Sequence, residues 1–574
     1  MKLSHVVVGE RGSLVDQVMN RIGASTAGVR SIEPQAARLA ELPALAEDEV
    51  WAFVALAGVG LAGTPDLEGA QQVFMHAERA GLRRLVLVAS TAIYEPSHHH
   101  PAQIHEDQRA LRHISNPIAA RWLDLEVMAR DWRDRTGAAL AILRCAPVIH
   151  PDGSDYFSRL LASRWAVTPV GFDPSLQFAT PEDLASAIVR VVEAQADGVF
   201  HVAPRAVMPL RQALRVARCR RLPVPTAMQW LPRRLLASRG RVAPCAQLDY
   251  LKHSFTVSPE KLVRELRVPL RHTSEQAIET LVEPRPSAGR PQAPAAVVAR
   301  DASEVAQPDP FGLDEAYVTR LGKTLFRFLH DHYWRVEWRG LEHIPRSGRA
   351  VIAGVHRGHQ PWDGVMTFHL LARELGRYMR FLIHPSLVKF PFLAPYMIKC
   401  GGIHACLENA AWVLERDGLL GIYPEGIRGA FTLYRDAYRL GKFGRDEYVR
   451  IALRHRAPIV PHVTVGSAEI FPILARVDWP WFRRVSEWPF LPITPTMGTV
   501  PLPSKWHTWF LEPISVEDYA PEAADDRATV KAISQEVRER MEAAIEEMLR
   551  RRKSIFWGSI FETQEDVALG EEPA

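Results

Sequence analysis

One segment rich in proline, alanine, serine and glycine constrains the fold of this chain more than any other sequence feature. It covers residues 284–312 and shows neither the period of a helix nor that of a strand. Because proline fixes φ and lacks an N–H donor, we expect an extended, solvated linker there. The 574 residues are therefore predicted to form two folded halves, residues 1–283 and 313–553, followed by a tail at 554–574.

The first half alternates apolar runs with amphipathic stretches. Strands that are apolar throughout belong to parallel sheets covered by helices on both faces. We therefore predict an α/β fold, with a Rossmann-like, doubly wound parallel sheet in this half. The expected strands cover residues 5–9, 50–58, 82–94 and 138–149, and the clearest expected helices cover 67–82 and 119–137.

Composition excludes several classes of protein. A net charge of +4 gives no large basic field, so we expect no nucleic-acid partner. The five cysteines contain no CxxC pair, so we expect neither a disulfide framework nor a structural metal site, and a reducing compartment fits. The N-terminus reads as a buried strand and not as a signal peptide, and no run of 18 apolar residues predicts a membrane-spanning helix.

A glycine turn follows the first expected strand. Gly9 and Gly12 stand between that strand and a helical pattern, where glycines let a backbone approach a pyrophosphate at a helix N-terminus. The position of the third glycine of such a turn holds Val15, whose branched side chain would push the helix away from the strand. Binding of NAD(P) by Gly9 and Gly12 and a tight turn without a ligand both remain open.

Four sequence blocks, VVVGERG, LRRLVLVASTAIYEP, LQFATPEDLASAIVRVVE and FTVSPEKLVRELRV, make the first half similar to the extended short-chain dehydrogenase/reductase family. That family uses a Tyr and a Lys four residues later, because the Lys lowers the pKa of the phenol. Counted from Asn116-Pro117, these positions are Ile118 and Trp122. The resemblance therefore implies a scaffold, a substrate gate or a nucleotide sensor. NAD(P)-dependent epimerase or reductase activity is the alternative. We interpret His98, His99, His100 and His105 as loop residues and not as metal ligands.

The second half carries polar residues where expected strands end. His356 closes the strand at 348–356, and Asp363 opens an apolar periodic run, where an aspartate is also a common helix cap. Glu425, Gly426 and Arg428 follow the next buried run in GIYPEGIRG. Arginine pairs with phosphate oxygens in a bidentate way. These residues therefore suit either a catalytic site or ordinary capping and turns.

The order of blocks across residues 334–515 resembles the glycerolipid acyltransferase superfamily, in its diacylglycerol-acyltransferase-like branch. The blocks include VEWRGLEHIPRSGRAVIAGVH, GGIHACLENA, YPEGIRG and LPITPTMGTVPLPSKW. The superfamily places four residues between its His and its Asp, whereas six separate His356 from Asp363 and three separate His359 from Asp363. We prefer His356, which directly follows the strand, and His359 is the alternative.

The resemblance implies a C-terminal α/β acyltransferase domain and a mechanism. His356 would take a proton from an acceptor hydroxyl, Asp363 would orient the imidazole, and Glu425, Gly426 and Arg428 would bind the acceptor's polar head. Acyl-CoA or an acyl carrier protein would donate the acyl group to a lipid acceptor, without a metal or redox cofactor. A non-catalytic protein that binds lipid and senses nucleotide is the remaining alternative.

Aromatic and basic residues alternate at 470–492, where Trp479, Trp481, Phe482, Trp488 and Phe490 accompany three arginines (Arg476, Arg483, Arg484). Trp and Arg together suit the headgroup layer of a bilayer. We therefore expect a cytoplasmic protein that attaches peripherally to the cytoplasmic face of a membrane. The alternative is that these aromatics fill a core.

Overall fold

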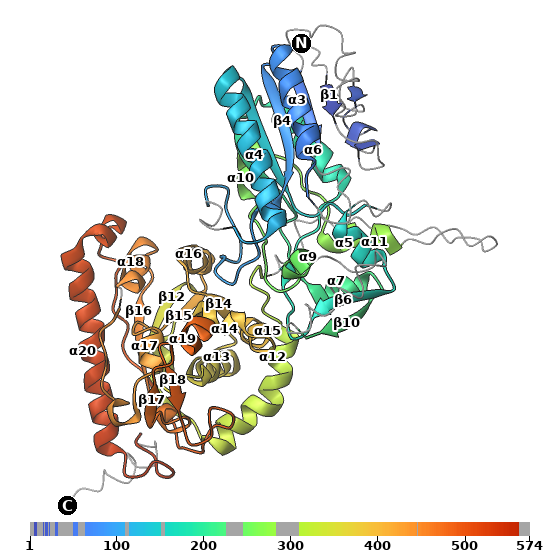
Figure 1. Cartoon of the computed structure of the whole chain (residues 1–574). Coiled ribbons are helices and arrows are strands. Elements are labelled where there is room, and N and C mark those ends of the chain that lie inside the picture. Colours follow the sequence, from blue (N-terminus) through green and yellow to red (C-terminus); the bar gives the residue numbers. More distant parts are fainter. Residues whose placement is uncertain are drawn as a thin grey trace, which may run out of the picture. The chain divides into compact units, whose positions relative to one another are not determined.

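The computed structural model divides the chain into two compact units, residues 1–312 and 313–574 (Figure 1). Parts of the predicted linker (284–308) and of the tail (562–574) lie outside the described residues. The structure describes residues 5–8, 15–16, 18–20, 22, 29–32, 50–54, 64–108, 114–150, 155–225, 245–282, 309–444 and 446–561.

A six-stranded parallel sheet forms the centre of the first unit, in the order β2-β1-β3-β4-β5-β8. All side chains of β4 from Leu85 onward are buried, so both faces of the sheet are covered at this strand. The strand order reverses at β1, with β2 on one side and the later strands on the other, as in doubly wound folds. This confirms the predicted fold class. The strands are β1 (His5–Val8), β2 (Val29–Ile32), β3 (Val50–Val54), β4 (Arg84–Ser90), β5 (Ala139–Cys145) and β8 (Gly198–Val202).

Capping residues define the ends of helix α4 in this unit. Asn116 caps α4 by accepting a hydrogen bond from the Ile118 N–H, and Gly137 ends the same helix with a φ of 67°. Helix α4 packs beside α3, and α4 and α6 both contact β4 and β5. The helices are α3 (Leu67–Arg79), α4 (Pro117–Thr136), α5 (Tyr156–Ala162), α6 (Pro181–Glu193), α7 (Leu210–Val216), α9 (Cys245–Asp249), α10 (Glu260–Leu266) and α11 (Ser274–Val282). Two small sheets pair β6 (Trp165–Pro169) with β10 (Arg220–Val224) and β7 (Ser175–Leu176) with β9 (Met208–Pro209).

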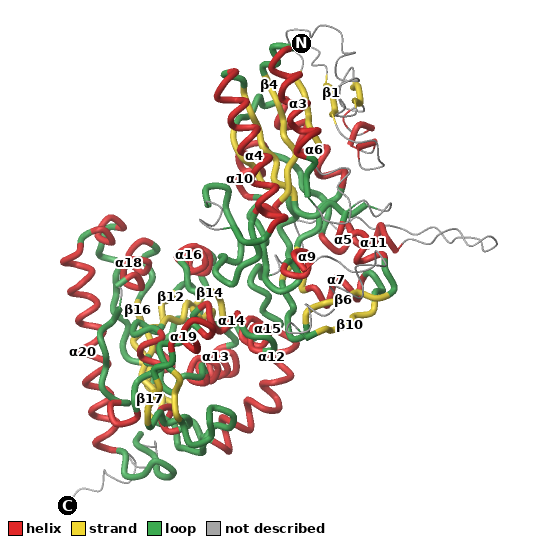
Figure 2. Tube along the Cα trace, viewed as in Figure 1, coloured by secondary structure: helices red, strands yellow, loops and turns green. Residues whose placement is uncertain are grey.

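A seven-stranded mixed sheet organises the second unit, in the order β11-β19-β16-β12-β15-β13-β14. Figure 2 shows strands of this unit, such as β12, β14 and β16, among its helices. Its strands are parallel except where β19 pairs with β16. Strand β12 lies at the centre and is buried along its whole length. The strands are β11 (Glu337–Arg339), β12 (Ala350–Gly354), β13 (Arg380–Ile383), β14 (Gly402–His404), β15 (Leu419–Ile422), β16 (Ile459–Val465) and β19 (His507–Phe510).

Helices and one hairpin surround this sheet. The predicted C-terminal helix is α20, the longest helix among the described residues. The hairpin pairs β17 (Ala475–Val477) with β18 (Leu491–Ile493). The helices are α12 (Glu315–Leu321), α13 (Trp362–Leu375), α14 (Pro385–Lys389), α15 (Leu393–Lys399), α16 (Leu407–Glu415), α17 (Ile427–Ala430), α18 (Glu447–Arg454), α19 (Pro480–Ser486) and α20 (Arg527–Arg551), with π-helical turns at Gly322–Phe326 and Leu329–Tyr333.

Among the residues described, no helix combines the length and the apolar character needed to cross a bilayer.

Candidate active site

His356 and Asp363 meet at the carboxyl end of the central strand. Strand β12 ends at Gly354, and the chain then turns through His356 into α13, whose first turn contains Asp363. His356 Nδ1 lies 2.8 Å from Asp363 Oδ1 and 2.7 Å from Oδ2. The fold therefore brings together the two residues that the sequence selected, in spite of the six residues between them.

The hydrogen bonds fix the protonation of this pair. A carboxylate only accepts hydrogen bonds, so Nδ1 of His356 is the donor to Asp363 and Nε2 is the ring nitrogen left for a substrate. Backbone N–H groups of Arg357 and Gly364 donate to the carboxylate of Asp363 at 3.0 and 2.8 Å. The Asp363 side chain is 1% exposed and that of His356 is 14% exposed. The buried carboxylate thus holds the imidazole at Nδ1 while part of the ring remains exposed, an arrangement that suits a general base.

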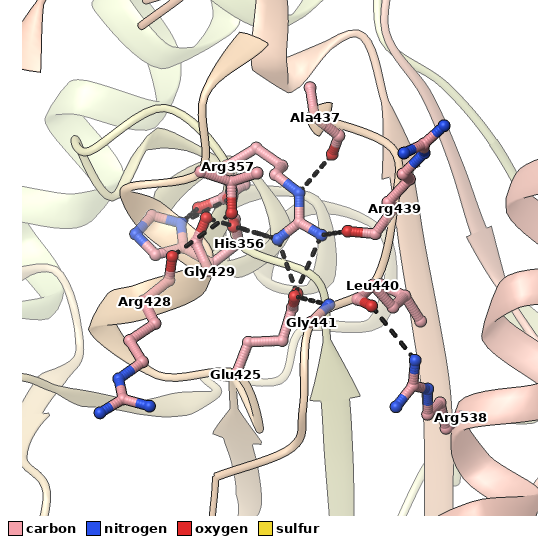
Figure 3. Close-up of polar contacts among 12 residues, drawn as sticks. His356, Arg357, Glu425, Arg428, Gly429, Ala437, Arg439, Leu440, Gly441 and Arg538 are labelled. Atoms are coloured by element: carbon pink, nitrogen blue, oxygen red, sulfur yellow. Dashed lines mark hydrogen bonds and ion pairs between the residues drawn. The ribbon is translucent and has the colours of Figure 1, made fainter. Parts of the chain in front are cut away.

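A buried ion pair supports the loop that carries His356. The guanidinium of Arg357 donates to both oxygens of Glu425, at 2.6 and 3.2 Å, and to the carbonyl oxygen of His356 at 2.8 Å (Figure 3). It also donates to the carbonyl oxygens of Ala437 and Arg439. Glu425 follows β15, the parallel neighbour of β12, so both residues emerge at one edge of the sheet.

The structure gives Glu425 a part that the sequence did not predict. Its Oε1 accepts the Gly441 N–H at 2.7 Å, its Oε2 accepts from Arg357, and its side chain is 4% exposed. Both oxygens of the carboxylate are therefore engaged by groups of the protein itself. The sequence analysis did not select Arg357. The available signal was an arginine directly after His356 together with Glu425 in the turn that follows a later buried strand.

Gly426 and Arg428, unlike the side chain of Glu425, each line a pocket. Gly426 has φ 59° and ψ −153°, a conformation essentially limited to glycine, and it lines the cavity in front of His356. In Figure 3 the Arg428 side chain points away from the Arg357–Glu425 pair. It lines a second, more open pocket.

The cavity in front of His356 has a volume of about 200 Å³ and mostly apolar walls. The polar part of its lining consists of His356, His359, Asp363, His384 and Ser386. The lining comes from segments that include or follow the carboxyl ends of β12, β13, β14 and β15, together with Trp488. The apolar lining consists of Phe381, Leu382, Ile383, Leu387, Ala405, Ile422, Tyr423, Ile427, Ala430, Phe431 and Trp488.

His359, the alternative base, lines the same cavity but does not contact Asp363 through any hydrogen bond of the described residues. Its ring packs among aromatic side chains, 5.2 Å from that of Phe471 and 5.9 Å from that of Trp488 between centroids. Burial lowers the pKa of His359 to about 4. His359 is therefore neutral near pH 7, and of these two histidines His356 is the one with hydrogen bonds to Asp363 among the described residues.

The aromatic residues of 470–492 divide into two groups. Phe482, Trp488 and Phe490 are half-buried, and the rings of Trp488 and Phe490 pack on Phe431, with centroids 5.3 and 5.4 Å apart. These three residues therefore pack against protein beside the cavity and keep part of their surface exposed. Trp479 and Trp481 are 48% and 60% exposed.

Two positions of the amino-terminal unit, selected in the sequence by the resemblance to reductases, carry apolar side chains. Ile118 and Trp122 lie in α4 and are 5% and 2% exposed, within the core. Tyr94, after β4, is buried beside Arg144 and His201, and burial raises its pKa to about 12. Neither Ile118 nor Trp122 carries a group that can transfer a proton. Gly9 and Gly12 lie outside the described residues.

Comparison with known proteins identifies the second half. A family model described as Acyltransferase matches residues 335–465, which include His356, Asp363 and Glu425. The uncharacterized protein Rv0502 of Mycobacterium tuberculosis is 36% identical over 258 residues, which cover 44% of this chain and 72% of that protein. The chain belongs to the family of that protein and has an acyltransferase domain. The chain is therefore an acyl-transfer enzyme.

Two further relatives extend this comparison. The uncharacterized protein ML2427 of Mycobacterium leprae is 34% identical over 258 residues, covering 44% of the acyltransferase and 70% of that protein. Phytyl ester synthase 2, chloroplastic, of Arabidopsis thaliana is 29% identical over 150 residues, covering 24% of this chain and 20% of that one.

Solved structures similar to the acyltransferase include an epimerase. UDP-glucose 4-epimerase of Thermus thermophilus in complex with NAD has a TM-score of 0.36 and 14% identity, covering 49% of this chain and 97% of that one. RMD from Pseudomonas aeruginosa complexed with NADPH has a TM-score of 0.37 and 16% identity, covering 49% and 98%. These scores do not establish a shared fold, so the Rossmann-like assignment rests on the strand order described above.

Proposed function

We propose that this acyltransferase moves a fatty acyl group from a thioester, acyl-CoA or an acylated carrier protein, to a hydroxyl group of a lysophospholipid or related glycerolipid. The observation that supports the proposal is the contact of His356 Nδ1 with the buried carboxylate of Asp363, beside a cavity with apolar walls. An apolar cavity suits an acyl chain, and a base at its polar edge suits a hydroxyl acceptor.

The proposed reaction needs only the groups of this site. The acceptor hydroxyl gives its proton to His356 Nε2 while its oxygen attacks the thioester carbonyl carbon. Asp363 stabilises the imidazolium that results. The C–S bond then breaks, the imidazolium returns the proton to the leaving thiolate, and the products are an ester and a free thiol. One proton moves to His356 and back to the thiolate, and a C–O bond replaces the C–S bond, so the proposed step requires neither a metal nor a redox cofactor.

Arg357 and Glu425 act as positioning residues in this scheme. Arg357 holds the carbonyl oxygen of His356 and the carboxylate of Glu425 at the same time. A shift of about 1 Å at a reacting group can reduce a rate about 100-fold, so a rigid support behind the base favours the reaction.

We further propose peripheral attachment to the cytoplasmic face of a membrane. Eight of the twenty exposed large apolar side chains among the described residues come from the segment 474–500, and Arg476, Arg483 and Arg484 accompany them. Exposed Trp beside Arg suits a headgroup layer. Four cysteines, Cys145, Cys219, Cys400 and Cys406, are free, which fits a reducing compartment.

For the amino-terminal unit we propose a scaffold or nucleotide-sensing role without a reaction of its own. Ile118 and Trp122 replace the residues that would exchange protons, and Tyr94 is held protonated.

One experiment tests the central proposal. Purified protein is incubated with radiolabelled acyl-CoA and a panel of lipid extracts, and new labelled esters are separated by chromatography. We expect a labelled lipid ester from the native chain and a loss of roughly 10²–10⁴ in its rate of formation in His356→Ala. A folded His356→Ala variant that esterifies lipid at the native rate would overturn the assignment of the base.

A further inference from the structure

The tyrosine that directly follows β15 borders the cavity of His356. Tyr423 lines this cavity and is half-buried, and its ring centroid lies 5.3 Å from that of His356. We propose that the Tyr423 hydroxyl donates a hydrogen bond to the carbonyl oxygen of the thioester and stabilises the negative charge that this oxygen gains during acyl transfer. The inference rests on the proposed function, because it assigns a further catalytic residue to that reaction.

The hydroxyl group of Tyr423 is a donor that the protein itself does not use. Among the residues that the structure describes, it forms no hydrogen bond, and it is not one of the fully buried polar atoms that lack a partner, such as the hydroxyl of Tyr396. It therefore keeps part of its surface accessible, and the space that Tyr423 borders is the cavity. A substrate oxygen there would give this hydroxyl the partner that the mostly apolar walls do not offer.

Two glycines leave the room that the Tyr423 side chain occupies. A Cβ atom at Gly354, in β12, would lie 2.8 Å from Cε1 of Tyr423, and one at Gly364, in α13, would lie 3.1 Å from its hydroxyl oxygen. The ring therefore crosses the end of β12, with the hydroxyl beside the first turn of α13. Gly364 directly follows Asp363 and also lines the cavity. The hydroxyl thus lies beside the turn that carries the orienting carboxylate of His356.

The surroundings of Tyr423 keep its hydroxyl protonated. Burial, and to a lesser extent the negative charge of Asp363, holds the pKa of Tyr423 well above its ordinary value. A neutral phenol donates a hydrogen bond, whereas His356 is placed to accept a proton. The two neighbouring rings can therefore serve opposite ends of the same reaction.

Acyl transfer creates a charge that such a donor can stabilise. When the acceptor oxygen attacks the carbonyl carbon, a C–O bond forms, one electron pair of the C=O bond moves to the carbonyl oxygen, and His356 takes the acceptor's proton. When the C–S bond breaks, that electron pair re-forms the C=O bond, and the thiolate takes the proton from His356. Tyr423 keeps its own proton throughout. A donor already aimed at the carbonyl oxygen stabilises the charged intermediate more than the substrate and so raises the rate.

Other polar groups of the lining are less suited to this contact. Nδ1 of His384 and the hydroxyl of Ser386 lie 2.8 Å apart and pair with each other. The carboxylate of Asp363 would repel a negatively charged oxygen. His359 packs among aromatic rings, and its Nδ1 is fully buried. The Tyr423 hydroxyl combines a proton to donate, an accessible atom and a ring beside His356.

The first arm of the test measures the kinetics of Tyr423→Phe, which removes the hydroxyl and keeps the ring. We expect kcat for acyl transfer to fall by roughly 10²–10³. KM should change little, because the contact strengthens only as charge develops on the oxygen. The matched control is Tyr396→Phe, which removes a hydroxyl without a partner from α15 and should keep the native kcat.

The second arm needs no turnover. The His356→Ala chain binds palmitoyl-CoA that is isotope-labelled at the thioester carbonyl, and infrared difference spectroscopy records the C=O stretch of the bound thioester. A hydrogen bond to the carbonyl oxygen weakens the C=O bond and lowers this wavenumber. Adding Tyr423→Phe to His356→Ala should therefore move the band to higher wavenumber, whereas adding Tyr396→Phe should leave it in place.

The two arms separate this inference from the proposed reaction. If the native chain forms ester and Tyr423→Phe keeps the native kcat, the inference fails and the reaction stands. If the native chain forms no ester, the proposed reaction fails, and the infrared arm alone decides on the hydroxyl. An unmoved carbonyl band, or no binding of palmitoyl-CoA by the His356→Ala chain, also overturns the inference. A band that moves in the Tyr423→Phe variant but not in the control supports it.

Discussion

The guanidinium of Arg357 lies 2.6 Å from Oε2 of Glu425, and both side chains are buried directly behind the loop that carries His356. Each residue follows a different strand of the central sheet, β12 and β15. The pair therefore ties two strand-end loops together at the site, and its integrity should control both stability and activity.

Removing one member of this pair should destabilise the second unit strongly. For Glu425→Gln or Arg357→Met we expect a loss of about 3–5 kcal/mol in the free energy of unfolding, because a buried charge is left without its partner. Urea unfolding measures it. The control Arg349→Met breaks an exposed pair with Asp417 and should change stability by about 1 kcal/mol or less. Equal effects from both variants would contradict the importance of burial.

Replacing the orienting carboxylate should slow acyl transfer without unfolding the chain. In Asp363→Asn an amide N–H₂ meets the backbone N–H donors of Arg357 or Gly364, and the imidazole loses its preferred tautomer. By analogy with serine hydrolases we expect a drop of roughly 10²–10⁴ in kcat. Steady-state kinetics with a fixed acceptor measures it, and circular dichroism checks the fold. A variant with native kcat would show that the carboxylate does not orient the base.

The second histidine in the cavity should matter less to the chemical step than the first. His359→Gln keeps a polar side chain of similar reach but cannot act as a base. Because His359 has no hydrogen bond to Asp363 among the described residues, we expect the kcat of His359→Gln to stay within about tenfold of the native value, whereas that of His356→Gln should fall by roughly 10²–10⁴. Parallel kinetics of the two variants distinguishes them. The reverse order of effects would make His359 the base.

Buried histidines should make the second unit less stable in mild acid. Burial lowers the pKa of His462, which stacks on Phe510 in the sheet, to about 4. Between pH 6.5 and about 4 the unfolded chain binds a proton that the folded chain excludes, so the free energy of unfolding falls as pH falls through this range. The full effect of this group is roughly 3 kcal/mol. Urea unfolding at pH 7, 6 and 5 should show a smaller decline in His462→Gln than in the native chain, and equal declines would refute the assignment.

Membrane attachment should depend on the exposed tryptophans of the segment 474–500. We expect Trp479→Ser/Trp481→Ser to float with anionic liposomes several-fold less than the native chain, because tryptophan stabilises a protein at the headgroup layer. Trp557→Ser is the control, since Trp557 is 69% exposed but lies outside the segment. Unchanged flotation of the double variant would remove this segment from the contact.

Sequence alone determined the fold class, the alternation of elements and the acyltransferase character of the second half. Apolar runs such as β4 and β12 record burial directly, and amphipathic stretches such as the one at 119–137 predict helices from their own spacing. These signals lie within a few residues of one another, so they can be read without coordinates.

Tertiary structure alone decided how distant residues share the site. Glu425 reads as a ligand for a head group in sequence, yet it pairs with Arg357, 68 residues earlier. Trp488 reads as a membrane anchor, yet it packs on Phe431. Whether a charged or aromatic side chain meets protein or solvent depends on which strands are neighbours, and strand order arises from the packing of the whole sheet, which no local stretch of sequence records.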